Sequence, residues 1–314
     1  MDKMHQPAIK AGLVTLRVNV FPGGFNWPIY VGQDKGGFAR QGIAVTVLDT
    51  PNSIAQMTEF AEGQFDIAMT AVDNIVAYVV GQGQAPIGPQ PEFSAFMGVD
   101  SGFLSLVAAP DVKSIADLRG RTLSVDAMTT GYAFVLYDIM RRHGLDKDKG
   151  DYEVVSAGGM IQRWNGLQEG KHAATMLSAP YNIIATRAGL NELAKAVDVI
   201  GPYQGNVAAA RRAWIAENRS VVSGYVSSFK ESVAWLYRPD NRVEAIDILR
   251  RHLPLMTQDI AEASYRELLD PLRGFFRDCQ FDETGFETVL ALRGRYGLPF
   301  VELGDKSRFR CPIE

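Results

Sequence analysis

The sequence predicts an α/β protein with two lobes, each a mixed sheet flanked by helices, and a helical C-terminal segment packed on the first lobe. Three observations predict this architecture. Short apolar runs alternate with helical patterns from residue 13 to residue 211, and only helical patterns follow. A chain of 314 residues is also long enough to bury two hydrophobic cores.

The first lobe begins with alternating strands and helices. In chain order we expect strands at 13–20, 43–48 and 65–69. A helix opens at 27–32 after the first strand, and a second helix follows the second strand and begins with a capping box formed by Ser53 and Gln56. Each strand ends in a loop of polar, aromatic or small residues. Parallel sheets present such loops together at their carboxyl edge, where ligands bind. The first lobe therefore offers one wall of a binding cleft.

The second lobe has the pattern of an insertion. Residues 94–109 are almost continuously apolar, which predicts a long strand leaving the first lobe. Beyond it we expect a turn capped by Ser114 and Asp117, strands at 122–125, 152–155, 173–177 and 197–201, a helix at 130–143, a returning strand at 206–211, and helices at 220–237, 242–253, 259–268 and 282–296. The predicted lobes are residues 12–107 with 207–314, and residues 108–206, with the ligand cleft between them.

Charge and composition exclude some partners. The formal net charge is -4 and no basic stripe is present, so no nucleic-acid partner is expected. No run reaches the roughly 18 apolar residues of a membrane span. Residues 1–7 contain no apolar leader. We expect a periplasmic or lipid-anchored protein if a leader precedes this numbering, and a cytoplasmic protein if Met1 is the true start.

Cysteine usage leaves two alternatives open. Cys279 and Cys311 either form a disulfide that pins the C-terminal tail or remain two unlinked thiols. Neither has the spacing of a metal site, and only four histidines are available to assist, so no metal is expected.

Several motifs occur in a specific order. They are Asp-Lys-Gly-x-Phe at 34–38, Gly-Ile-x-Val at 42–45, Glu-Gly-Gln-x-Asp-Ile-Ala at 62–68, the block at 114–125, Gly-Leu-Gln-Glu-Gly at 166–170, Ser-Ala-Pro at 178–180, and Arg-Arg-Ala-Trp at 211–214 followed by Glu217 and Asn218. This order resembles the solute-binding proteins of nitrate, sulfonate, taurine and thiamine-precursor importers, which share a fold with the yeast thiamine-pyrimidine synthase. The resemblance covers roughly residues 12–255.

The resemblance implies a type II periplasmic-binding-protein fold. It also implies a monomeric receptor that captures a small organic solute by closing two lobes and delivers it to the membrane permease of an ABC importer, with no cofactor. The solute would be aromatic, heterocyclic, or similar to a sulfonate or carboxylate. The resemblance does not identify it.

The first lobe supplies seven candidate ligand-binding residues at its strand ends: Phe21, Phe25, Asn26, Trp27, Asn52, Thr70 and Asp73. Aromatic rings beside Gly23 and Gly24 bury apolar area at small entropic cost and suit stacking on a flat solute. The alternative is that two of the rings pack beneath the following helix. For Asp73, the alternative is capping of a helix N-terminus.

The second lobe supplies six more candidates: Asp126, Thr129, Thr130, Tyr132, Tyr181 and Tyr203. The start of a helix at 129–131 offers unpaired backbone N–H groups to an acidic group. In the resembling sulfonate and nitrate receptors, the matching turn commonly holds the ligand's acidic group. Because carboxylates at Asp73 and Asp126 would oppose a strongly anionic solute, we expect at most one net negative charge. Trp27 and Tyr181 are predicted to contact the solute from opposite lobes.

An enzyme on the same fold is the alternative function. The sequence has no nucleophile elbow, no phosphate-binding loop and no His-Glu-x-x-His motif. The resembling sulfinate desulfinase has a nucleophilic cysteine on the first cleft loop, where this chain has Gly23, Gly24 and Asn26. The yeast synthase has a Cys-rich segment that this chain lacks. A decarboxylase or hydrolase-like enzyme acting on a small aromatic or heterocyclic acid stays open. Its mark would be a His or Arg in the cleft, and His172 is the candidate.

Overall fold

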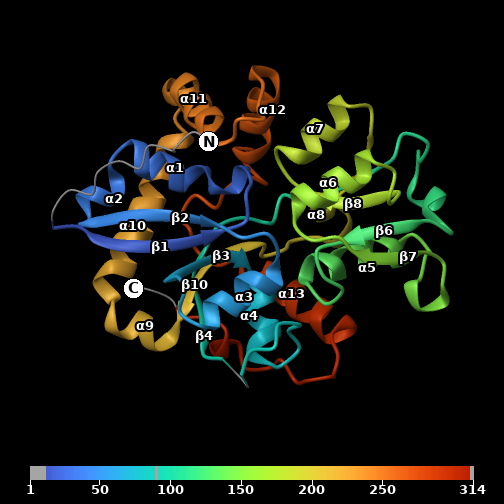
Figure 1. The fold of residues 1–314 in the computed structure, drawn as a ribbon, viewed down its shortest axis with the longest axis horizontal. Helices are drawn as coiled ribbons and strands as arrows, with labels where there is room; N and C mark the ends of the chain where they lie inside the picture. The colour runs from blue at the N-terminus through green and yellow to red at the C-terminus, as the bar shows by residue number, and fades with distance from the viewer. Residues whose placement is uncertain (1–11, 89–90, 312–314) are drawn as a thin grey trace.

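The structure is a computed structural model that describes residues 12–88 and 91–311. It contains two five-stranded mixed sheets, side by side in Figure 1. The first sheet has the order β2-β1-β3-β10-β4, from β1 (Val14–Val20), β2 (Ile43–Asp49), β3 (Ile67–Ala71), β4 (Phe93–Gly98) and β10 (Asn206–Arg211). The second has the order β7-β6-β8-β5-β9, from β5 (Ser105–Ala108), β6 (Thr122–Val125), β7 (Glu153–Ser156), β8 (Ala174–Leu177) and β9 (Asn191–Lys195).

Strand directions show how the second lobe is inserted. In the first sheet β1 runs parallel to β2 and β3, and the returning β10 runs antiparallel to β3 and β4. In the second, β6 runs parallel to β7 and β8, and the entering β5 runs antiparallel to β8 and β9. The carboxyl ends of the parallel strands carry the loops predicted to bind ligand.

Helices flank both sheets. The first sheet carries α1 (Trp27–Asp34), α2 (Gly37–Arg40), α3 (Ser53–Ala61) and α4 (Val72–Val79), and the second carries α5 (Gly131–Arg142), α6 (Met160–Gln168), α7 (Tyr181–Arg187) and α8 (Ala196–Ile200). The C-terminal helices are α9 (Arg212–Glu217), α10 (Arg219–Leu236), α11 (Arg242–His252), α12 (Gln258–Leu268) and α13 (Glu283–Tyr296). The predicted α/β class with two mixed sheets is confirmed. Of the helices described in 12–88 and 91–311, none has the length and apolar character needed to cross a membrane.

Three predicted elements differ from the structure. Residues 197–201 fall largely in helix α8, and the edge strand β9 lies just before them. The strand was missed because its residues are mostly polar and have low β-propensity, so that its pairing with β5 determines its structure. The predicted strand over 94–109 is two strands, since Gly102 and Phe103 have positive φ between them. Asn52, and not Ser53, caps α3 by accepting from the Ala55 N–H at 2.9 Å.

Two segments cross between the sheets, and they bond to each other. Val99 donates its N–H to Asn206 O at 3.0 Å, and Gly205 donates to Asp100 O at 2.8 Å. The first crossing lies between β4 and β5, so the predicted boundary at 107/108 falls inside a strand of the second sheet. The division into lobes stays a prediction. Below, a lobe means one sheet with its helices.

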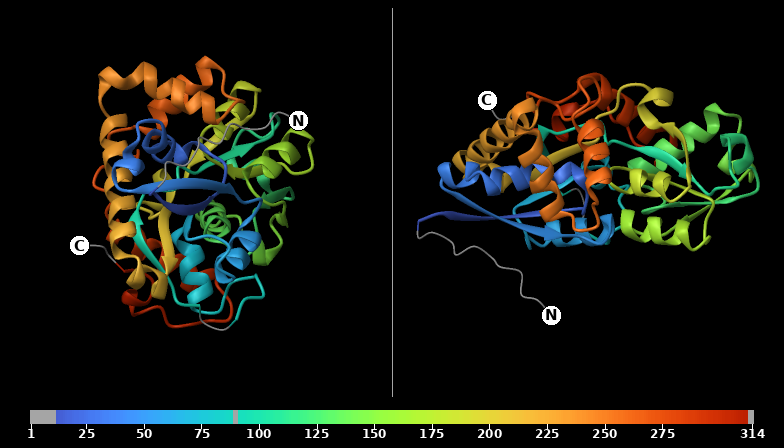
Figure 2. Two further views of the ribbon diagram at one scale, coloured as in Figure 1. Left: turned by 60° about the vertical axis from the view of Figure 1, so that its left-hand side comes forward. Right: turned by 90° about the horizontal axis from the view of Figure 1, so that it is seen from above.

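The C-terminal helices pack on the first lobe and also reach the second. Helices α10 and α11 pack against α1, whereas α12 contacts α7 and α13 lies against both α4 and α5. The view from above in Figure 2 shows these orange and red helices where the two halves meet. They therefore link the lobes through side chains as well as through the crossing segments.

A buried ion pair anchors α13. Arg293 donates Nε–H to Asp73 Oδ1 at 2.9 Å and Nη2–H to Asp73 Oδ2, and both side chains are almost fully buried. The same guanidinium donates to Gln82 Oε1 at 3.2 Å and, across the lobe junction, to Thr129 O at 2.8 Å. Its carbon also lies 4.5 Å from the centre of the Phe134 ring. One side chain thus joins α4, α13 and the start of α5.

Replacement of Arg293 by Met should destabilise the protein by about 3–5 kcal/mol, because the Asp73 carboxylate would remain buried without a counter-charge. Urea unfolding measures the change. Arg40→Met, which removes the exposed pair between Arg40 and Glu231, is the matched control and should cost under about 1 kcal/mol. Equal losses in the two variants would contradict this account.

A second prediction concerns Asp100, whose carboxylate lies between the crossing segments. It accepts from the Gly102 N–H at 2.6 Å and from the Asn206 N–H at 3.2 Å. Burial raises the pKa of Asp100 to about 6, although these hydrogen bonds lower it in part.

A carboxyl group whose pKa is higher in the folded state binds more protons when folded, so its contribution to stability is lost as the pH rises. Between about pH 4 and pH 6, we expect the free energy of unfolding of the wild type to fall by up to about 3 kcal/mol relative to Asp100→Asn. Urea unfolding of both proteins at pH 4, 5, 6 and 7 measures the difference. Parallel pH profiles would show that Asp100 titrates normally.

Candidate functional site

The strand-end loops of the two lobes are in direct contact. The hydrogen bonds that cross the junction include Gly24 N–H to Ala179 O at 3.0 Å, Gly159 N–H to Pro51 O at 3.2 Å, Ser53 N–H to Asp126 Oδ2 at 3.2 Å, Tyr132 O–H to Asn206 Oδ1 at 3.3 Å, and Arg293 Nη2–H to Thr129 O at 2.8 Å. We call the region between these contacts the cleft. The structure is therefore in a closed arrangement.

The first cleft loop approaches the second lobe closely. A Cβ atom at Gly24 would lie 2.8 Å from Leu268 Cδ1 and 3.0 Å from Ala179 O, so a larger residue would hold the lobes apart. Phe21 is partly buried and lines a cavity of about 320 Å³ together with Asp49, Thr50 and the start of α6. This cavity has walls from both lobes.

Asn26 and Phe25 are both buried in this loop. Asn26 donates Nδ2–H to Phe21 O at 2.7 Å, which fixes the turn, while its buried Oδ1 has no hydrogen-bond partner among the described residues. Phe25 packs in the hydrophobic core. Of the two, Asn26 has an unused acceptor to offer a solute.

Trp27 lies in the core of the first lobe and not in the cleft. It is fully buried, donates Nε1–H to Ala245 O at 3.0 Å, and meets Tyr265 edge to face with 5.9 Å between ring centres. Its only polar group is therefore satisfied on the side of α11. The structure gives no support to the predicted stacking of Trp27 on a solute, and the alternative of packing beneath the helix applies to it.

Asn52, Thr70 and Asp73 are engaged within the first lobe. Asn52 caps α3, and Thr70 Oγ1 accepts from Asn74 Nδ2–H at 2.9 Å. Asp73 is neutralised by Arg293 and lies inside α4, whose N-cap is Ala71, so the capping alternative for Asp73 is wrong. The expected repulsion of anions by Asp73 therefore disappears.

Asp73 also covers the predicted anion site at 129–131. A Cβ atom at Gly131 would lie 2.4 Å from Asp73 Cβ, so the start of α5 is pressed against the protein's own carboxylate. Thr129 gives its carbonyl to Arg293, and Thr130 donates Oγ1–H to Ala127 O at 3.0 Å. In the closed arrangement, this helix start has no room for a solute anion.

Asp126 reaches across the cleft from the end of β6. Its Oδ2 accepts from the Ser53 N–H, so it binds the start of α3 from the opposite lobe, and its buried Oδ1 has no partner among the described residues. Tyr132 contacts Asn206 across the junction and lies beside Tyr203, with ring centres 6.4 Å apart. Burial raises the pKa of both tyrosines well above its ordinary value.

Tyr181 faces the first lobe from the start of α7. It is buried in the same hydrophobic cluster as Phe25 and Tyr30 of the first lobe. Burial and the Asp49 carboxylate raise the pKa of Tyr181, and the same two causes act on Tyr30. Tyr30 and Tyr181 thus lie near one another, close to Asp49 at the carboxyl end of β2.

Three polar residues on helices next to the cleft were absent from the sequence prediction. Gln56 is buried, donates Nε2–H to Asn19 Oδ1 at 3.0 Å, and leaves its own Oε1 without a partner among the described residues. Its spacing from Ser53 suggested a capping role and concealed this position. Tyr30 and Arg163 were also missed, because a lone polar residue in a helix has no local signal that separates packing from binding.

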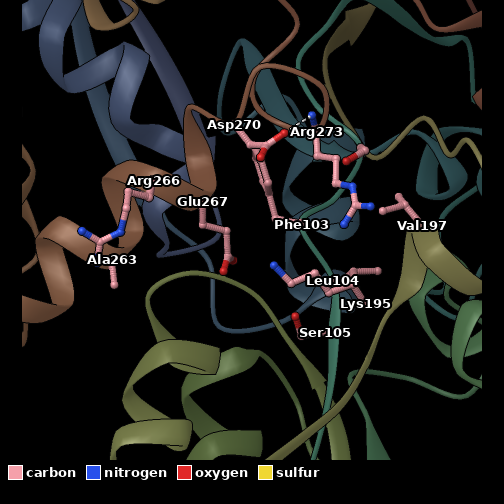
Figure 3. Close-up of a pocket in the computed structure, with 11 residues that line it drawn as sticks. Phe103, Leu104, Ser105, Lys195, Val197, Ala263, Arg266, Glu267, Asp270 and Arg273 are labelled. Atoms are coloured by element: carbon pink, nitrogen blue, oxygen red, sulfur yellow. Dashed lines mark hydrogen bonds between the residues drawn. The ribbon is translucent and has the colours of Figure 1, made fainter. Parts of the chain in front are cut away.

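A second cavity, of about 270 Å³, opens between α12 and the second sheet (Figure 3). Lys195 and Glu267 point into it from the two lobes (Figure 3). Asn182 donates Nδ2–H to Glu267 Oε1 at 2.9 Å and so ties α7 to α12. Burial raises the pKa of Glu267, and Lys195 lowers it in part.

The metal, histidine and cysteine candidates contribute no site. Within the described part of the chain, no group of three or more His, Cys, Asp or Glu side chains could hold a metal ion. His172 is buried inside the second lobe, with Nε2 3.0 Å from Arg163 O, and burial lowers its pKa. Cys279 and Cys311 are free thiols, and burial raises the pKa of Cys279 to about 12.

Known structures resemble this one over nearly its whole length. The ligand-binding component of an ABC-type import system from Staphylococcus aureus matches with a TM-score of 0.76 and 13% identity over 95% of this chain and 96% of that chain. The alkanesulfonate-binding protein SsuA from Xanthomonas axonopodis pv. citri gives 0.72 and 12% over 91% and 93%. The periplasmic nitrate-binding protein NrtA from Synechocystis PCC 6803 gives 0.74 and 11% over 94% and 84%.

These likenesses confirm the periplasmic-binding-protein fold. No curated protein matches the sequence. A family model described as NMT1/THI5 like matches residues 26–242, which is more than half of the chain. The chain therefore belongs to the NMT1/THI5-like family.

Proposed function

We propose that this protein is the solute-binding receptor of an ABC importer and that it captures a small organic solute by closing its two lobes. The observation that carries the proposal is the closed cleft itself. The elements on either side of the junction carry buried acceptors that have no described partner, namely Asn26 Oδ1, Gln56 Oε1 and Asp126 Oδ1. Buried polar atoms in native proteins are normally paired, so a bound solute is the natural source of the missing donors.

The solute is small and flat or compact. Phe21 supplies aromatic surface to the cavity between the lobes, whose volume of about 320 Å³ suits a small ligand. The structural neighbours are named for alkanesulfonate and nitrate, and at 11–12% identity they support the fold and leave the solute open.

The crossing segments supply the hinge for this motion. In the open form the lobes would separate at the hydrogen bonds between their strand-end loops, and the closed form would deliver the solute to a membrane permease. The receptor works as a monomer on the outer side of the cytoplasmic membrane. The alternative, a decarboxylase or hydrolase-like enzyme, calls for a His or Arg in the cleft, and its candidate His172 is packed inside the second lobe and bonded to the backbone of α6.

A solute that binds only the folded protein must raise its melting temperature. We therefore expect stabilisation by at least one compound from a panel of nitrate, sulfonates, pyrimidines and aromatic acids. The same compound should shift the small-angle X-ray scattering profile from a more open form toward that calculated for this closed structure. No stabilisation by any compound class, with an unchanged scattering profile, would contradict the receptor function.

Once a solute is identified, Tyr181→Ala should weaken its binding about thirtyfold, a loss of about 2 kcal/mol, because an aromatic contact from the second lobe is removed. Titration calorimetry measures the change. Val243→Ala is the control, since Val243 is exposed on α11, and it should leave the affinity unchanged. Unchanged affinity in Tyr181→Ala would remove Tyr181 from the site.

A further inference from the structure

Arg163 is a buried guanidinium without a carboxylate partner. It lies in the first turn of α6, its residue is only 4% exposed, and no Asp or Glu oxygen among the described residues lies within 4 Å of it. Nε–H donates to Gly158 O at 3.1 Å, and Nη1–H donates to Met176 O. Nη2 makes no hydrogen bond to a described residue.

This arrangement leaves a charge to be compensated. Arginine stays protonated in proteins, and buried charges are ordinarily paired with an opposite charge because carbonyl dipoles replace only part of the lost hydration. Burial lowers the pKa of Arg163, and the charges of Asp126 and Tyr132 oppose this shift in part. Asp126 is itself engaged with the Ser53 N–H across the junction.

The guanidinium is also fixed in place at the cleft-facing edge of the second sheet. Gly158 follows the carboxyl end of β7, and Met176 lies one residue before the carboxyl end of β8. These two carbonyls hold two sides of the planar group, and Nη2 remains as a preorganised donor. The unpartnered Asp126 Oδ1 belongs to the neighbouring loop after β6.

We propose that Arg163 binds the anionic group of the solute, so that the solute is an organic monoanion, a carboxylate or sulfonate, with an N–H or O–H donor for Asp126. This inference rests on the proposed receptor function and names the substrate class of the same cleft. It moves the anion site from the start of α5, which Asp73 covers, to the start of α6.

The test compares matched acids and neutral amides. The panel holds pairs with aromatic, heterocyclic and aliphatic frames, including 4-aminobenzoate with 4-aminobenzamide and sulfanilate with sulfanilamide. Thermal shift and titration calorimetry are carried out on the wild type, Arg163→Gln, Arg163→Lys and the exposed control Arg121→Gln. We expect the tightest binders to be acids, with each matched amide at least about tenfold weaker in the wild type.

Arg163→Gln should weaken the acid about 10- to 100-fold and leave the amide unchanged, Arg163→Lys should retain part of the preference for acids, and Arg121→Gln should behave as the wild type. If Arg163 only braces the Gly158 turn, Arg163→Gln lowers the stability of the protein and leaves its preference for acids unchanged. That result would overturn the inference. The acid-to-amide comparison uses the wild type, so it decides even if Arg163→Gln does not fold.

The outcomes also separate this inference from the receptor function. If neutral or cationic compounds bind as tightly as acids and close the lobes, the receptor function stands and the role of Arg163 is overturned. If no compound of any charge binds, both are overturned.

Discussion

The two lobes must satisfy one another's buried polar groups, because closing them removes water from the strand-end loops. The backbone donors of Gly24, Ser53 and Gly159 all find acceptors in the opposite lobe. No described residue of either lobe donates a hydrogen bond to Gln56 Oε1 or Asn26 Oδ1. These two buried acceptors therefore still lack a donor in the closed form. The same constraint that holds the lobes together therefore also selects what can bind between them.

Charge is distributed unevenly over this junction, and the distribution decides which solutes it favours. Asp73 and Arg293 neutralise one another, so the carboxylate that the sequence analysis placed in the cleft contributes no net repulsion. Asp126 remains as a carboxylate and Arg163 as a guanidinium, both at the edge of the second sheet. The expectation of a solute with moderate charge stays a prediction, and its proposed physical basis is now the balance of Arg163 and Asp126.

The sequence predicted the secondary-structure elements better than the contacts between side chains far apart in the chain. Strands with apolar alternation and helices with clear caps were found within one or two residues, because those signals are local, as for β6, β10 and α12. The roles of Trp27 and Asp73 were set by groups more than 200 residues away, Ala245 and Arg293, which no local pattern reveals. The aromatic loop does lie at the junction of the lobes, but which ring faces the cleft depends on how α11 packs against α1 and α12 against residues 24–26.

Opening the lobes need not leave a buried charge without a partner. Arg293 keeps Asp73 within the first lobe when it releases Thr129 O, and Asp138 of α5 keeps Arg141 and Arg142 when it releases Arg295 of α13. Arg163 differs, since its buried guanidinium has no carboxylate partner among the described residues of either lobe. If closure dehydrates this one charge, a solute anion that replaces the lost water stabilises the closed form more than the open one. A ligand shifts a conformational equilibrium only by such a difference, so Arg163 would couple recognition of the solute to closure of the cleft.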